Sequence, residues 1–175
     1  MRVHLPHTAG DMPGARGQAL IELAITLMLL VALMLGIFDY SRAIHAQSVI
    51  TNMSREGANL ISRANQNLSG DEATDFQNVL DLIGKSAQPL DMVNQGMMYI
   101  YRVERVNNQN AITRQLAWNH SAASPKPAMS SSAAALGGIT LNAGQVVYGV
   151  EVYYRYKSIF LGTRFSPVLK SISIF

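Results

Sequence analysis

The feature that most constrains this sequence is an apolar run that contains a single charge. Residues 19–38 read ALIELAITLMLLVALMLGIF, and Glu22 is the only ionisable side chain among them. A helix of this length is ~30 Å long, which matches the hydrocarbon core of a bilayer. A cleaved secretory signal is the alternative, but its apolar core usually has ~7–15 residues and ends at an A-x-A-like site. The run here is longer than such a core, and the residues after it, DYSRAIHAQ, contain no clean A-x-A site. We therefore expect a retained, single-pass transmembrane helix.

Composition agrees with a membrane protein and excludes several other classes. Only 14% of the 175 residues are charged and 49% are hydrophobic, with a mean hydropathy of +0.12. The net charge of +3 comes from cations scattered singly along the chain, whereas nucleic-acid binding needs clustered cations. The chain has no Cys, which excludes disulfides, thiolate metal sites and cysteine nucleophiles. We expect no nucleic-acid partner.

The residues before the apolar run predict how the chain is oriented. Residues 1–17 are polar and contain Arg2 and Arg16. Lys and Arg near a membrane span favour the cytoplasmic side. We therefore expect a short cytoplasmic leader, 1–17, and export of everything after Asp39.

The helix is expected to continue beyond the membrane. From residue 39 to residue 65 there is no Pro, and apolar or small residues recur at a helical period, namely Ile50, Met53, Gly57, Leu60, Ile61 and Ala64. Such a pattern is one face of an amphipathic helix. We predict one helix from about residue 18 to about residue 66, with 18–40 spanning the membrane and 41–66 as its extension.

Residues 67–175 are expected to form an exported α+β head. Ser69 and Glu72 have the spacing of a capping box, and a short helix is predicted at about 71–83, with Gly84 just past its end. After Pro89 the apolar period changes to two, which predicts a small antiparallel β-sheet from strands at 97–106, 112–118, 145–160 and 168–175. Asn-rich residues 107–110 are expected to turn between the first two strands. The Ser-, Ala- and Pro-rich stretch 120–138 is expected to be a flexible loop.

The third of these strands predicts one buried and one half-exposed face. The even-numbered residues from Val146 to Tyr156 are expected to face the core. The odd-numbered residues from Val147 to Lys157, with Glu151 and Tyr153 among them, are expected to be half exposed.

The spacing of a glycine and a glutamate at the membrane entrance resembles a known processing site. Glu22 follows Gly17 by five residues and is followed by an apolar helix. This resembles the N-terminus of type IV prepilins and pseudopilins, in which a prepilin peptidase cuts after the glycine and leaves glutamate as the fifth mature residue. The resemblance implies cleavage between Gly17 and Gln18.

A longer stretch resembles the TadE-like family. The matching pieces are Arg16-Gly17-Gln18-Ala19, Glu22, Gly36-Ile37-Phe38-Asp39-Tyr40, the region of Gln47, and Arg55-Glu56-Gly57-Ala58. The chain departs from the family pattern at Leu23, where an aromatic residue is common, and at Met28, where a proline is common. The resemblance implies a pilin-like fold and a minor pseudopilin of the tight-adherence (Flp) pilus, acting in cell adhesion from the bacterial inner membrane with a periplasmic head. The partners it implies are the peptidase, other pilins or pseudopilins and the pilus assembly platform.

Three groups of charged residues are candidates for assembly contacts. Glu22 is expected to pair with the new α-ammonium of a neighbouring subunit, because an intramembrane charge is usually paired. Asp39 and Arg42 have the i,i+3 spacing of a helical ion pair. Arg55 and Glu56 contact a partner subunit or form a solvated helix face, and the sequence leaves both alternatives open.

Catalytic and metal-binding motifs are not found in the sequence. His45 and His120 have no carboxylate or second His at metal-ligand spacing, and the two His of the leader lack a third ligand. Two roles are open for Trp118 and the strand tyrosines: stacking on a bound sugar, or filling the core. Core packing is the commoner role for such large rings. We expect no enzyme, no cofactor, no metal and no small-molecule substrate.

Two other functions are compatible with the sequence. A pseudopilin of a type II secretion-like system has the same N-terminal helix. A membrane-tethered periplasmic binding module could use the aromatic sheet and the 120–138 loop.

Overall fold

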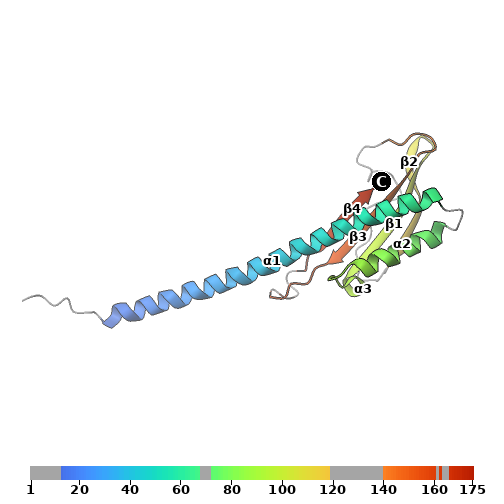
Figure 1. Ribbon diagram of the computed structural model, residues 1–175. Coiled ribbons are helices and arrows are strands. Elements are labelled where there is room, and N and C mark those ends of the chain that lie inside the picture. Colours follow the sequence, from blue (N-terminus) through green and yellow to red (C-terminus); the bar gives the residue numbers. More distant parts are fainter. Residues whose placement is uncertain (1–12, 68–71, 119–139, 161, 163–165) are drawn as a thin grey trace, which may run out of the picture. The chain divides into compact units, whose positions relative to one another are not determined.

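The computed structural model describes residues 13–67, 72–118, 140–160, 162 and 166–175 (Figure 1). The chain divides between Tyr40 and Ser41 into two compact units, and helix α1 (Pro13–Asn67) runs from the first into the second. The other elements all belong to the second unit: α2 (Glu72–Ser86), α3 (Met92–Gln95), β1 (Gly96–Val106), β2 (Gln109–Trp118), β3 (Val146–Arg155) and β4 (Val168–Ile174). The fold is α+β, as predicted.

Helix α1 confirms the prediction of one long N-terminal helix. It begins five residues earlier than predicted, at Pro13, because proline is favoured at the first helical position, where no backbone N–H is needed. In the first unit, the side chains of residues 17–38 are exposed on every side of the helix. Among the described residues, one stretch, Gly17–Ala64, is long and apolar enough to cross a membrane, with a mean hydropathy of 2.6 in its most apolar window. A single apolar helix of this kind indicates membrane anchoring.

Helix α2 confirms the predicted short helix but ends later, at Ser86. Gly84, predicted to follow the helix, is therefore a helical residue, and a Cβ on it would lie 2.9 Å from the indole ring of Trp118. The Trp118 Nε1 donates to Oδ1 of Asp81, also on α2, over 2.9 Å. Gly84 thus permits close packing of α2 on β2 rather than ending the helix. Ser69, the other half of the predicted capping box, lies outside the described residues, as do the leader residues 1–12 and the loop 120–138.

The four strands form one antiparallel sheet in the order β2-β1-β3-β4. The turn between β1 and β2 is tighter than predicted, because Asn107 and Asn108 both adopt positive φ, 50° and 63°, as a two-residue hairpin turn requires. Strand β3 ends at Arg155 instead of continuing to residue 160. The N–H of Tyr156 still donates to the carbonyl of Pro167, but Pro167 has no N–H to return a bond, so the ladder stops there.

One face of the sheet packs against α1 and α2 and forms the main core. Within the second unit, this core contains Ile50, Met53, Ala58 and Ile61 of α1, Phe76, Val79, Leu80 and Ile83 of α2, and Met98, Ile100, Tyr148, Val150 and Val152 of the sheet. The rings of Phe76 and Tyr148 pack edge to face, with centroids 5.9 Å apart. Gly57 marks the closest approach of α1, since a Cβ there would lie 2.5 Å from Cδ1 of Ile83 and 3.3 Å from Val150. The inward face predicted for β3 is confirmed at residues 148, 150 and 152.

The opposite face of the sheet is also buried, and the expectation of a half-exposed face is wrong there. Its second core contains Met97, Tyr99, Tyr101, Val103, Leu141 and Tyr153. Glu151 lies on the same face and is fully buried. Period-two alternation distinguishes the two faces of a strand, but it does not show that both are covered.

Candidate functional site

The predicted processing site lies near the beginning of α1, in the first unit. Gly17 is exposed, and a Cβ built on it would meet no atom within 4 Å outside its own helix backbone and chain neighbours. The space beside Gly17 is therefore open in the described chain, on the residue that precedes the predicted cut. A residue without Cβ also leaves the carbonyl before the Gly17–Gln18 peptide bond open to approach.

Glu22 lies one turn beyond Gln18, on the same exposed face of the helix as Gln18. Its Oε1 accepts a hydrogen bond from Nε2 of Gln18 over 3.0 Å, and its backbone carbonyl accepts one from Oγ1 of Thr26 over 2.8 Å. Both bonds link residues four apart, which face each other on a helix. The carboxylate of Glu22 thus accepts a hydrogen bond from the neutral side-chain amide of Gln18, the residue that would become the N-terminus after a cut at Gly17.

Large apolar side chains surround α1 after Glu22. Leu23, Ile25, Leu27–Val31, Leu33–Leu35, Ile37 and Phe38 are all exposed. Soluble monomers rarely expose a contiguous apolar surface this large, and such surfaces contact lipid or other proteins. This part of α1 has the chemistry of a helix that packs in a membrane.

The other predicted contact residues lie in different environments. Asp39 is only 1% exposed, whereas Arg42, which lies in the second unit, is exposed and lines a cavity there. Arg55 and Glu56 are both exposed on α1. The roles of all four residues, and the Asp39–Arg42 pair, remain predictions.

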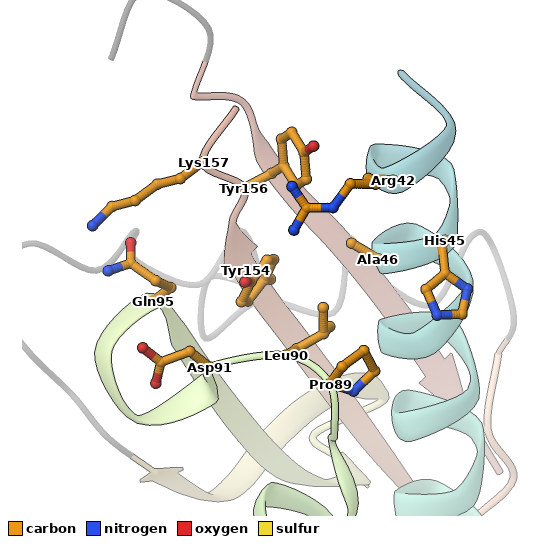
Figure 2. Close-up of a pocket in the computed structure, with 10 residues that line it drawn as sticks. All are labelled: Arg42, His45, Ala46, Pro89, Leu90, Asp91, Gln95, Tyr154, Tyr156 and Lys157. Carbon is orange, nitrogen blue, oxygen red and sulfur yellow. The ribbon is translucent and has the colours of Figure 1, made fainter. Parts of the chain in front are cut away.

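A cavity of about 360 Å³, which the sequence did not predict, lies within the second unit (Figure 2). It is enclosed by three segments that are distant in sequence, from α1, from the connection between α2 and β1, and from the end of β3. Its lining residues are Arg42, His45, Ala46, Pro89, Leu90, Asp91, Gln95, Tyr154, Tyr156 and Lys157. No motif in the sequence joins these segments, so spacing alone could not have found the cavity.

A buried polar cluster on the outer face of the sheet is the second feature that the sequence did not predict. The carboxylate of Glu151 accepts hydrogen bonds from the hydroxyl of Tyr101 and, over 2.6 Å, from that of Tyr153. Nζ of Lys170 lies 2.8 Å from Glu151 Oε1 and 5.6 Å from the centre of the Tyr153 ring. Burial, together with the nearby negative charge of Glu151, raises the pKa of the Tyr99 hydroxyl above its ordinary value. The cluster links β1, β3 and β4 and has the character of a structural network.

Metal-ligating side chains do not gather anywhere in the described part of the chain. No group of three or more His, Asp or Glu that could hold an ion occurs there. His45 lies on the cavity wall, and His120 is outside the described residues. Trp118 packs against the main core, and its indole N–H donates a hydrogen bond to Asp81. Of the two roles expected for this residue, core packing and stacking on a sugar, the structure shows core packing.

The fold and the exposed apolar helix define a class of protein: an α+β head on a long N-terminal helix with the character of a membrane anchor. Residues 17–59 match the model of the family described as TadE-like protein. The match includes Gly17, Gln18 and Glu22 and confirms the resemblance seen in the sequence. It associates this segment with the tight-adherence pilus. No curated protein and no solved structure matches the chain.

Proposed function

We propose that the chain is a TadE-like pseudopilin, a structural and assembly component of a tight-adherence pilus. In this proposal a prepilin peptidase cuts after Gly17, and the processed subunit packs against others through α1. The observation that carries the proposal is the position of Glu22, five residues after an uncovered glycine and at the start of an exposed apolar helix.

The energetics of Glu22 support processing. A charged residue at the centre of a membrane helix costs ~2.5–3.5 kcal/mol on insertion scales, and a smaller amount near its end. A cut after Gly17 creates an α-ammonium on Gln18, one turn from the carboxylate. In a bundle of parallel helices, the ammonium of one subunit neutralises the carboxylate of its neighbour. Assembly then removes the free-energy cost of an unpaired Glu22 carboxylate, which the isolated helix carries in the membrane.

The apolar surface of α1 supports helix-to-helix packing as the means of assembly. Residues 23–38 present Leu, Ile, Val, Met and Phe side chains on all sides, so several neighbours can pack around one subunit. The orientation that accompanies this proposal places the leader in the cytoplasm and the α+β head in the periplasm, with the helix in the inner membrane. Arg2 and Arg16 on the leader side agree with the positive-inside rule.

The experiment that tests the proposal is to determine the N-terminus of the protein recovered from membranes. The full chain is produced in one bacterial host that contains a prepilin peptidase and in the same host without it. We expect the chain from the first host to begin at Gln18 and the chain from the second at Met1. Recovery of chains that begin at Met1 from both hosts, with the peptidase active on one of its own pilins, would overturn the proposal.

A further inference from the structure

The cavity of the second unit has the size of a small-molecule site. Its volume of about 360 Å³ is within the range of ligand pockets in proteins, roughly 300–1,000 Å³. Figure 2 shows Arg42 reaching from α1 toward the strand side of the cavity, where Tyr154 and Tyr156 lie. Lys157 extends from the chain just after β3, on the side away from Arg42.

The wall of this cavity carries a net positive charge, with Arg42 and Lys157 against one acid, Asp91. Among the described residues, no ion pair joins Arg42 or Lys157 to Asp91. The one acid in the wall, Asp91, is the N-cap of α3, and its carboxylate accepts hydrogen bonds from the backbone N–H of Asn94 at 3.2 Å and from Nδ2 of Asn94 at 2.9 Å and 3.1 Å. These donors are neutral and leave the charge of Asp91 in place, so two cations and one carboxylate give the wall a net positive charge.

Tyr154 adds a neutral hydrogen-bond donor between these charges. Burial, with a smaller effect of the negative charge of Asp91, raises the pKa of its hydroxyl above the ordinary value; a backbone hydrogen bond at Asp91 and the charge of Arg42 oppose this rise. The hydroxyl therefore keeps its proton at neutral pH. An arginine, a lysine and a tyrosine hydroxyl are a donor set suited to phosphate oxygens.

The position of the cavity along the chain identifies the source of that phosphate. Arg42 follows Phe38, the last residue of the apolar run, by four residues of continuous helix, which is a rise of ~6 Å. The headgroup layer of a leaflet is roughly 5–8 Å thick, so a cation at this distance lies at the level of lipid phosphates.

Exposed apolar side chains flank each segment of the cavity wall. Ile44 neighbours His45 on α1, and Val93 lies between Asp91 and Gln95. Ile159 and Phe160 follow Lys157 by two and three residues and are also exposed. Cations combined with exposed apolar side chains are the composition of a membrane-surface contact.

We propose that this cavity binds the phosphate of an anionic phospholipid headgroup in the leaflet where α1 leaves the membrane, with Arg42 and Tyr154 as its donors and Lys157 as a second cation on the cavity wall. The inference rests on membrane insertion of residues 19–38 and is independent of the pilus role, so either can fail alone.

The test measures lipids retained by the full chain. The protein is reconstituted in nanodiscs that contain equal amounts of phosphatidylglycerol and phosphatidylcholine, and native mass spectrometry counts the lipids that remain bound after release. We expect one phosphatidylglycerol to be retained in preference to phosphatidylcholine. The double variant Arg42→Gln/Lys157→Gln should lose roughly 30-fold in that preference, about fivefold for each cation. The matched variant Arg55→Gln/Lys85→Gln, which removes the same charge from exposed positions outside the cavity, should retain it.

Three results would overturn the proposal. The first is equal retention of the two lipids by the wild-type chain, a result that does not depend on any variant folding. The second is retention of phosphatidylglycerol by a folded Arg42→Gln/Lys157→Gln variant at the wild-type level. The third is displacement of the lipid by a large molar excess of inorganic phosphate, which would assign the cavity to a soluble anion. Cleavage of the leader is measured on the same samples, so failure of the lipid site and failure of processing are distinguished.

Discussion

Nε2 of Gln18 lies 3.0 Å from Oε1 of Glu22, so the first residue of a processed chain and the carboxylate one turn later are hydrogen-bonded neighbours on one face of α1. Before processing, the carboxylate receives a neutral amide from this residue. Cleavage after Gly17 adds a positive charge to the same residue. In the proposed processing, a single cut would convert a weak local contact into a charged pair that adjacent subunits could share.

A bulky side chain at Gly17 is expected to block processing. Both Gly17 and Gly36 have no neighbouring atom within 4 Å of a built Cβ, so neither Gly17→Val nor Gly36→Val creates a clash in the described chain. The valine at 17 places a branched Cβ next to the bond that is cut, and most of that variant should accumulate with its leader attached. The Gly36→Val control should be processed. Intact-mass measurement of both proteins from a peptidase-containing host checks this, and normal processing of Gly17→Val would contradict it.

Gly57 is expected to be needed for packing of the head. A Cβ there approaches Ile83 to 2.5 Å and Val150 to 3.3 Å, both in the main core. Overpacking of this kind typically costs ~1–3 kcal/mol, so Gly57→Val should lower the free energy of unfolding by about that amount. The control Asn59→Val adds the same side chain at an exposed position two residues away. Denaturant unfolding of the detergent-solubilised chain measures both, and equal stability of the two variants would count against the described packing.

The ion pair between Lys170 and Glu151 is expected to stabilise the sheet. Glu151 is fully buried, and Lys170 is the cation bound to it. Lys170→Met leaves the carboxylate with hydroxyl donors alone, and the loss of a hydrogen bond to a charged group costs ~1.5–3 kcal/mol. Lys85→Met, at an exposed site on α2, should change stability by less than about 0.5 kcal/mol. Thermal unfolding of the two variants gives the comparison, which fails if Lys170→Met melts like the control.

Stability is expected to fall in alkaline solution because of Tyr99. Burial and the charge of Glu151 raise the pKa of this hydroxyl above 10.0 in the folded chain. Above that pH the unfolded chain loses the proton first, so the folded state binds more protons and the free energy of unfolding falls as pH rises. The contribution of Tyr99 to stability is complete below the pKa that its hydroxyl has in the unfolded chain. It is lost as the pH rises through the higher pKa of the folded chain. Tyr99→Phe should flatten this alkaline decline, and an unchanged slope would contradict the assignment.

The helices and strands were predictable because their signals are local. The apolar run, the 3.6-residue period between Ile50 and Ala64 and the period of two in β3 each occur within one continuous segment. Gly84 was placed wrongly because its neighbour, Trp118, comes from a strand more than thirty residues away. A glycine just after a helical pattern normally indicates a C-terminus, and only the tertiary contact shows otherwise.

The charged features of the head were harder to predict. Glu151 occupies an odd position of an alternating strand, and charged residues on such a face are usually solvated. Its burial depends on hydroxyls and an ammonium from three strands. The cavity joins Arg42, Asp91 and Lys157, which share no spacing pattern. In contrast, Gly17 and Glu22 were identifiable because their relation is contained in six consecutive residues.

The most direct test of the central claim is to replace the carboxylate and count subunits in filaments. Glu22→Gln keeps the size of the side chain and removes its charge, while Gln18→Ala removes the neutral donor and keeps the α-ammonium that processing creates. Each variant is produced with the complete pilus machinery, and its amount in sheared filaments is compared with its amount in membranes. The account predicts that Glu22→Gln is processed and inserted but is lost from the filament fraction, whereas Gln18→Ala is incorporated. Incorporation of processed Glu22→Gln at the wild-type level would contradict it.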